Sequence, residues 1–291
     1  MGGFFVPSSQ RNLDRLLMVT QPVTMTQPNP TRRKLAIASW SAPKEGIIYG
    51  QMSVDVSATL KHIEKLREQS GLKISITHLV GKAVALGLRA APGLNGRIHL
   101  GKFIPFDQVA FAYLVALEDG GDLAKVKVEN ADQKSVIDIA QQLADEAQRL
   151  RAGKDEAFNK SKPLLRLLPS WLIRPLVQLT GWLAGSLGAR IKALGVEPFP
   201  FGACCITSVG MFGIEVGYAP HTPWARTPML VSICQIKDQV VAIDGQPCVR
   251  PMMTLTATID HRFVDGFAAG QFARTIRQVL EHPEMLDETL G

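Results

Sequence analysis

The stretch VRPMMTLTATIDHRFVDG, residues 249–266, decides the fold. Met252–Ile259 is a run of apolar and β-branched residues, which is typical of a strand. His261 comes directly after that run, and the residues from Gly266 to about Glu281 are expected to form the last helix. Gly266 has no side chain and therefore permits a tight turn between the two elements. The stretch predicts a strand, a turn that carries His261, and a helix.

The rest of the chain mixes helices and strands without strict βαβ alternation. This pattern favours an α+β fold, a two-layer sandwich with a mixed, largely antiparallel sheet. Val109–Ala116 is mostly apolar, so this strand is expected to be buried on both faces. Ser57 is expected to cap the first helix by accepting from the free N–H groups of its first turn. Further strands are expected at Gly46–Val54, Ala203–Val209, Met229–Ile236 and Gln239–Ile243, and helices at Ser57–Glu68, from Thr77 to Pro92, and at Ser135–Arg151.

The composition is that of an ordinary globular protein. Of 291 residues, 46% are hydrophobic and 20% are charged, and the formal net charge is +6. Lys and Arg are scattered rather than gathered with aromatic residues in one stripe, so nucleic-acid binding is not expected. The four cysteines form no C-x-x-C pair and have no histidine at zinc-ligand spacing, so no metal site is expected. They are interpreted as buried small side chains in a reducing compartment.

The two ends of the chain are expected to differ in order. Residues 1–31 are rich in Pro, Gln, Thr and Ser and are expected to form an extended N-terminal arm. Residues 32–291 are expected to form one compact domain. The N-terminus lacks a charged leader and a long apolar run, so no secretory signal is expected and the protein is predicted to be cytoplasmic.

A hydrophobic helical insertion is expected at about 160–198. Its apolar residues lie in 164–196, and the uncharged run between Arg174 and Arg190 has 15 residues, fewer than the ~20 that a bilayer requires. Two interpretations remain open. The segment is either a helical hairpin packed on the domain or on a neighbouring subunit, or a basic amphipathic segment that contacts lipid.

His261 and Asp265 offer the chemistry of a general base. An imidazole has a pKa near neutrality and suits the removal of a proton from a thiol or hydroxyl. The deprotonated group can then attack a thioester carbonyl. The alternative is a structural histidine that is hydrogen-bonded at the end of a strand, and the pattern H-x-x-x-D-G alone does not separate the two.

Three more stretches accompany residues 249–266 in a fixed order. They are ITSVGMFG (206–213), the segment Thr77–Asn95 with its ending PGLN, and LEHPE (280–284). Together these residues resemble the catalytic domain of the dihydrolipoyl acyltransferases of 2-oxo-acid dehydrogenase complexes, which is related in fold to chloramphenicol acetyltransferase. The resemblance runs from about residue 30 to the end and is interrupted by the hydrophobic insertion.

The resemblance implies roles for individual residues. His261 matches the family's general base, and Asp265 matches an aspartate that holds the architecture of the site by pairing with an arginine. Arg32 and Arg33 are the candidates for that arginine. Thr207 matches a hydroxyl that donates to the oxyanion of the tetrahedral intermediate.

Three further positions support this assignment. Ser208 is the alternative oxyanion donor if the register is shifted by one residue. Asn95 ends the segment that precedes the substrate channel of the family, and Gly266 completes the histidine motif. The resemblance therefore implies a CoA-dependent acyltransferase that moves an acyl group between CoA and a thiol acceptor of the dihydrolipoyl type.

The resemblance also implies an assembly and its partners. A homotrimer is expected, with active sites at the subunit interfaces, and coenzyme A or acyl-CoA is expected as a substrate. No lipoyl domain is expected within this chain, so no covalently bound lipoyl group is expected on it. A lipoyl-bearing protein would then act in trans, and a free-standing trimer is expected rather than a large core. Two alternatives remain: a catalytically idle trimeric scaffold of the same fold, and an acyltransferase with a small hydroxyl or amine acceptor.

Overall fold

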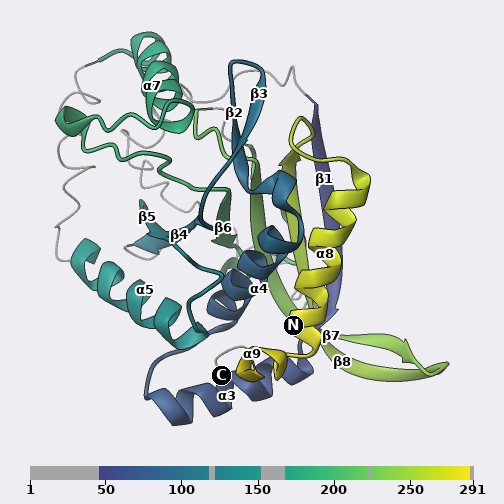
Figure 1. Cartoon of the computed structure of the whole chain (residues 1–291). Helices are drawn as coiled ribbons and strands as arrows, with labels where there is room; N and C mark the ends of the chain where they lie inside the picture. Colours follow the sequence, from purple (N-terminus) through teal and green to yellow (C-terminus); the bar gives the residue numbers. More distant parts are fainter. Residues whose placement is uncertain (1–45, 118–121, 152–167, 222–223, 289–291) are drawn as a thin grey trace, which may run out of the picture.

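The computed structural model describes residues 46–117, 122–151, 168–221 and 224–288. Six of its strands form one mixed sheet. Their order across the sheet is β1-β8-β7-β6-β4-β5 (Figure 1). Strand β6 lies parallel to both of its neighbours, and the other three pairings are antiparallel. The strands are β1 (Ile47–Asp55), β4 (Phe111–Leu117), β5 (Asp122–Val128), β6 (Cys204–Ser208), β7 (Met229–Ile243) and β8 (Gln246–Asp260). The expected α+β fold with a mixed, largely antiparallel sheet is confirmed.

Helices cover one face of this sheet, and the hydrophobic core lies between the two layers (Figure 1). Helix α8 (Gly266–Glu281) shows why: Phe272, Ile276, Val279 and Leu280 repeat at helical spacing, and all four are buried. Helix α4 (Ile76–Ala90) lies beside α8, with Gly87 against the ring of Phe272. The remaining helices are α3 (Ser57–Ser70), α5 (Val136–Arg151), α7 (Ser170–Gly185) and α9 (Met285–Glu288). A two-stranded sheet of β2 (Gly96–His99) and β3 (Lys102–Pro105) completes the fold.

Strands β7 and β8 form a long ribbon that projects from the body of the protein (Figure 1). The two strands expected at Met229–Ile236 and Gln239–Ile243 are one strand with a bulge between Ile233 and Ile236. At the tip, Asp244 and Gly245 both have positive φ, 50° and 76°. A two-residue Asp-Gly loop with this backbone is the turn that best matches the twist of a β-hairpin.

The cap predicted for the first helix is wrong. Ser57 is the first residue of α3 and does not accept from its N–H groups; its own N–H and hydroxyl donate to Asp55 Oδ1, at 2.8 and 2.5 Å. The carboxylate two residues earlier in the chain therefore takes the role that was assigned to the serine hydroxyl.

The described part of the hydrophobic insertion contains one long helix. Helix α7 has 16 residues and is followed by a 3-10 turn, Lys192–Leu194. Residues 164–167, the arm 1–31 and both Arg32 and Arg33 lie outside the described residues. Among the helices that the structure describes, none combines the length and the apolar character needed to cross a membrane.

Candidate active site

His261 lies immediately after β8, in the turn that leads to α8. Its backbone N–H donates to Gly46 O at 3.0 Å, which joins the turn to the start of β1. The ring nitrogen Nδ1 lies 2.6 Å from Val264 O. A carbonyl oxygen can only accept, so the hydrogen of the neutral ring must be on Nδ1. Nε2 then carries a lone pair, and the side chain is exposed. This geometry suits a general base.

The same turn is held by an ion pair between Asp260 and Arg262. Arg262 donates to the Asp260 carboxylate from its backbone N–H at 3.0 Å, from Nε at 2.9 Å and from Nη2 at 2.5 Å. Burial by itself would raise the pKa of Asp260, but the hydrogen bonds and the charge of Arg262 outweigh it, so the pKa is lowered. Asp260 therefore stays charged beside the exposed histidine. Sequence reasoning missed this pair, because Arg262 lies in the turn after β8, where strand alternation does not apply.

Asp265 is the N-cap of α8. Its Oδ1 accepts from Ala268 N at 3.0 Å, which satisfies one of the free N–H groups of the first helical turn. The arginine partners proposed from the resemblance lie outside the described residues, so their pairing with Asp265 stays a prediction. Gly266 does not have left-handed backbone angles, and a Cβ built there would have nothing within 4 Å. The turn is therefore compatible with glycine at position 266 without depending on it.

The turn at Pro92–Leu94 lies next to the His261 turn. A Cβ built on Gly93 would be 3.3 Å from Phe263 O, and the rings of Phe103 and Phe263 meet edge to face at 6.3 Å. The Asn95 amide lies 3.4 Å from the carbonyl oxygens of Phe106 and Gln108. Two segments that the resemblance placed near the substrate are thus adjacent in space.

Thr207 and Ser208 point to opposite faces of β6. Cys204 and Ile206 belong to the core under the helices, so alternation places Ser208 on that face and Thr207 on the other. Both side chains are half-buried. The structure thus separates the two candidate oxyanion donors by face.

The glycine motif after Thr207 packs on the bulge of β7. A Cβ at Gly210 would lie 2.6 Å from the carbonyl atoms of Cys234, so only glycine fits there without a shift of the backbone. Val209 N donates to Ile233 O at 2.9 Å, and Gln235 N donates to Ile214 O at 2.8 Å. These contacts fix the end of β6 against β7.

Thr207 and His261 are far apart within one chain. Thr207 is level with Ser232 of β7, which pairs with Thr256 of β8, five residues before His261. Five residues span about 17 Å along a strand and two strand spacings about 10 Å, which gives a separation of about 20 Å. Two groups that act on one carbonyl must both lie within about 3 Å of it. A site that uses both residues must therefore draw them from two copies of the chain.

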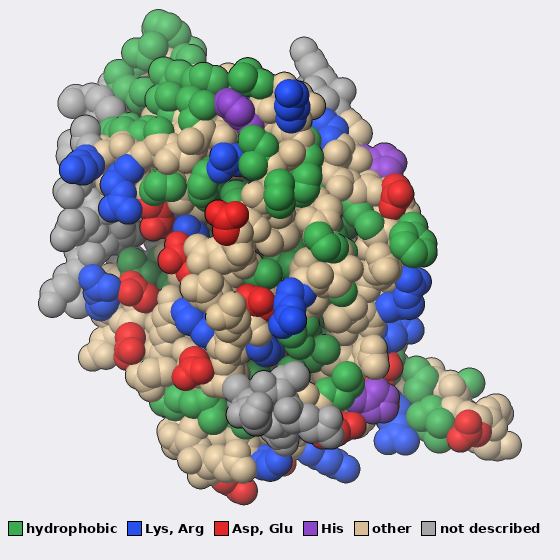
Figure 2. Space-filling model, in the orientation of Figure 1, with side chains coloured by type: hydrophobic (Ala, Val, Ile, Leu, Met, Phe, Trp, Pro, Cys, Tyr) green, Lys and Arg blue, Asp and Glu red, His purple; other side chains and the backbone are tan. Residues whose placement is uncertain are grey.

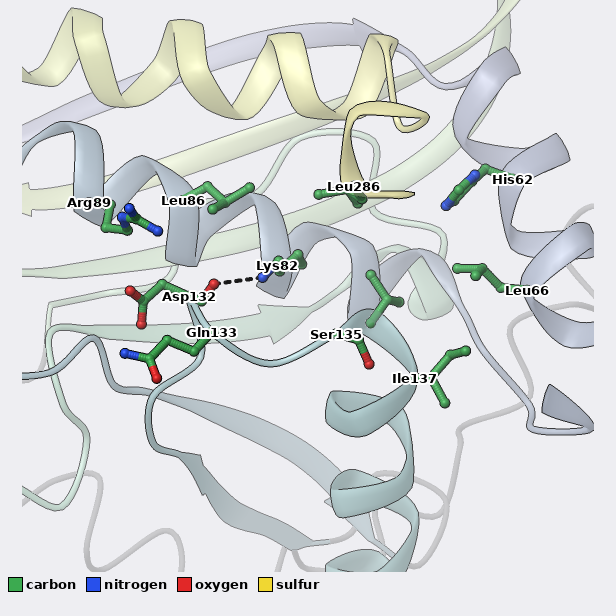
Figure 3. A pocket seen from close by; sticks show the side chains of 11 residues that line it. His62, Leu66, Lys82, Leu86, Arg89, Asp132, Gln133, Ser135, Ile137 and Leu286 are labelled. Carbon is green, nitrogen blue, oxygen red and sulfur yellow. Dashed lines mark hydrogen bonds between the residues drawn. The ribbon is translucent and has the colours of Figure 1, made fainter. Parts of the chain in front are cut away.

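A cavity of about 360 Å³ lies elsewhere, between α3, α4, α9 and the turn before α5 (Figure 3). Lys82 reaches from α4 and donates to the carbonyl oxygens of Asp132 at 2.8 Å and Lys134 at 2.7 Å. Burial lowers the pKa of Lys82. The lysine holds the turn that starts α5, and neither His261 nor Thr207 lines this cavity.

Comparison with known proteins gives consistent matches. The family model of the 2-oxoacid dehydrogenases acyltransferase (catalytic domain) matches residues 26–158 and 186–287. The succinyltransferase component of the 2-oxoglutarate dehydrogenase complex of Saccharomyces cerevisiae is 25% identical over 239 residues, 80% of this chain and 42% of that protein. The acetyltransferase component of the acetoin cleaving system of Bacillus subtilis is 26% identical, over 81% of this chain and 50% of that protein. The chain therefore spans about half the length of these relatives or less.

A solved structure shares the fold. The crystal structure of a probable dihydrolipoamide acetyltransferase from Listeria monocytogenes has a TM-score of 0.62 and 18% identity, and the match covers 97% of this chain and 94% of that one. Helix α7 lies entirely within residues 159–185, the interval that the family match leaves out.

Proposed function

Since the chain belongs to the 2-oxoacid dehydrogenase acyltransferase family, catalytic domain, we propose that it transfers an acyl group between CoA and a thiol acceptor. The geometry of His261 is the observation that carries this proposal. Its Nδ1 is committed to Val264 O, and its Nε2 is left with a lone pair at an exposed strand end. An imidazole nitrogen held in this way can accept the proton of a thiol.

The reaction starts with removal of the thiol proton of the acceptor by His261 Nε2. The thiolate attacks the thioester carbonyl of acyl-CoA, and the carbonyl oxygen becomes an oxyanion. The Thr207 hydroxyl donates a hydrogen bond to this oxygen, a contribution of typically about 3 kcal/mol in a dry site. Collapse of the intermediate breaks the bond between the carbonyl carbon and the CoA sulfur. The imidazolium of His261 then donates its proton to the CoA sulfur.

The active site is formed between two copies of the chain. The separation of about 20 Å between Thr207 and His261 supports this arrangement, because neither copy alone can place both groups on one carbonyl. A homotrimer offers three such interfaces by rotation of one contact. Ser208, on the opposite face of β6, is the alternative donor.

The acceptor is a dihydrolipoyl-type thiol. The relatives from yeast and Bacillus subtilis are both dihydrolipoyllysine-residue acyltransferases, which supports this acceptor class. A lipoyl group carried by a separate protein would meet this chain in trans. A small hydroxyl or amine acceptor is the alternative within the same chemistry.

The direct test is acyl transfer from acetyl-CoA and succinyl-CoA to dihydrolipoamide. The transfer is measured by the release of free CoA. We expect His261→Ala to abolish transfer while the protein keeps its oligomeric state. His282→Ala is a matched control, because this histidine is also exposed and pairs with Glu284 at 3.3 Å. Unchanged turnover in His261→Ala rules out the proposed base. A wild-type protein that is inactive with acyl-CoA and with thiol, amine and alcohol acceptors supports the idle scaffold instead.

A further inference from the structure

The outer face of α7 is apolar where a surface helix is normally polar. Six exposed residues of α7 lie next to one another around the helix axis and form one stripe. Only Gln178 among them is polar. At 100° per residue these positions span about 120° of the helix surface, the width of a complete apolar face. The apolar members are Trp171, Leu172, Pro175, Leu179 and Trp182. Figure 2 shows hydrophobic side chains gathered over α7 at the edge of the molecule.

The opposite face of α7 already holds the helix on the protein. Ile173 and Ala184 are fully buried, and a Cβ at Gly181 would lie 2.1 Å from Trp224 O. Arg226 Nη1 donates to Ser186 Oγ at 3.0 Å at the end of the helix. Small residues let the inner face of α7 pack closely on the protein, and this packing determines which face of the helix points outward. The apolar stripe is therefore on the surface.

The described part of this segment carries charge of one sign. Residues 168–196 contain no Asp or Glu and three basic residues, Arg174, Arg190 and Lys192, whereas 26 of the 291 residues of the whole chain are acidic. Arg190 and Lys192, which follow α7, are exposed. An apolar face with tryptophans and leucines beside basic side chains is the pattern of a helix that lies in the plane of a membrane interface. Anionic headgroups supply the complementary charge.

We propose that the outer face of α7 docks on a membrane surface that contains anionic phospholipids. The helix lies on the bilayer and does not cross it, because 16 residues span about 24 Å and a bilayer core is about 30 Å thick. Tryptophan side chains favour the headgroup level, where the ring is half in apolar and half in polar surroundings. The proposal does not rest on the proposed acyl transfer, since α7 lies in the interval that the family match leaves out.

The test is flotation of the full-length protein with two kinds of vesicle, phosphatidylcholine alone and phosphatidylcholine mixed with phosphatidylglycerol. We expect binding to the anionic vesicles, weaker binding when salt is raised, and at least about a tenfold loss of binding in the double variant Trp171→Ser, Leu179→Ser. The control is Val240→Ser with Val249→Ser, which removes two equally exposed apolar side chains from the tip of the β7–β8 ribbon.

A second measurement leaves the residues of α7 unchanged. With Trp40→Phe and Trp224→Phe, only the α7 tryptophans remain, and we expect their emission to shift to shorter wavelength and to be quenched by brominated lipid. Three results would overturn the proposal: no preference for anionic vesicles, equal binding by the α7 variant and the control, or no quenching. Loss of the oligomer in the α7 variant, measured by light scattering, would also overturn it, since a second copy would then cover this face.

Discussion

Two inactive variants are expected to restore each other when they assemble into one oligomer. The first is His261→Ala, which removes the base. The second is Thr207→Val, which keeps the shape of the side chain and removes the hydroxyl. We expect His261→Ala to be inactive and Thr207→Val to lose about a hundredfold in turnover, with substrate affinity nearly unchanged.

The expected recovery follows from the distance between the two residues. Because Thr207 and His261 are about 20 Å apart in one chain, the proposed site takes its base from one copy and its donor from the next. In the proposed trimer, an oligomer that contains both variants has two copies of one and one copy of the other. One of its three interfaces then pairs an intact base with an intact donor, so the purified mixed trimers should reach about a third of wild-type activity.

The assay requires oligomers of mixed composition. The variants are coexpressed with two different affinity tags and purified over both columns, and acyl transfer from acetyl-CoA to dihydrolipoamide is measured. Activity no higher than the mean of the parents, in a preparation shown to be mixed, would refute a shared site. Loss of activity in Ser208→Ala but not in Thr207→Val would place the donor on the other face of β6.

Three further changes test the described structure. Burial lowers the pKa of His78 from 6.5 to about 4, so the unfolded chain binds more protons between these values and stability falls as pH drops through them. The loss over the whole window is about 3 kcal/mol, of which about 2 kcal/mol falls between pH 7 and pH 5. Urea unfolding of wild type and His78→Gln at these two pH values should show a smaller loss in the variant. Gly210→Ala forces a Cβ to 2.6 Å from Cys234 and should lower the free energy of unfolding by about 1–3 kcal/mol. Gly50→Ala is the control, because a Cβ there has nothing within 4 Å and should leave the stability unchanged. Equal melting temperatures of the two variants would contradict the packing. Asp260→Asn removes a buried charged acceptor and should cost about 1–3 kcal/mol; wild-type stability would show that the ion pair contributes nothing.

The parts of the fold that bury one face were predictable from the sequence. Helix α8 was expected from Gly266 to about Glu281 and is found there, because its apolar residues repeat at the helical period. The outer part of the β7–β8 ribbon was not predicted as one hairpin. Its residues are exposed on both faces, so no apolar alternation marks them, and the only local signal is the turn sequence Asp244-Gly245.

The position of the candidate site was predictable, but its hydrogen bonds were not. His261 stands at the end of a strand as expected, yet its partner, Val264 O, is a backbone atom whose place depends on the turn. Asp265 caps a helix, and the ion pair of the turn belongs to Asp260. Several hydrogen-bond donors lie within a few residues of each carboxylate. The backbone angles determine which donor binds it, and these angles cannot be read from the residue types alone.

Docking through α7 would orient the whole protein and not merely tether it. The inner face of the helix is fixed to the segment just before β7 by the close contact of Gly181 with Trp224 and by the bond from Arg226 to Ser186. Strand β7 lies between β6, which carries Thr207, and β8, which ends at His261. A rigid helix on that segment transmits the plane of a lipid surface to the strands of the site, because packed elements move together. The acceptor would then approach a site whose orientation to the membrane is set by α7.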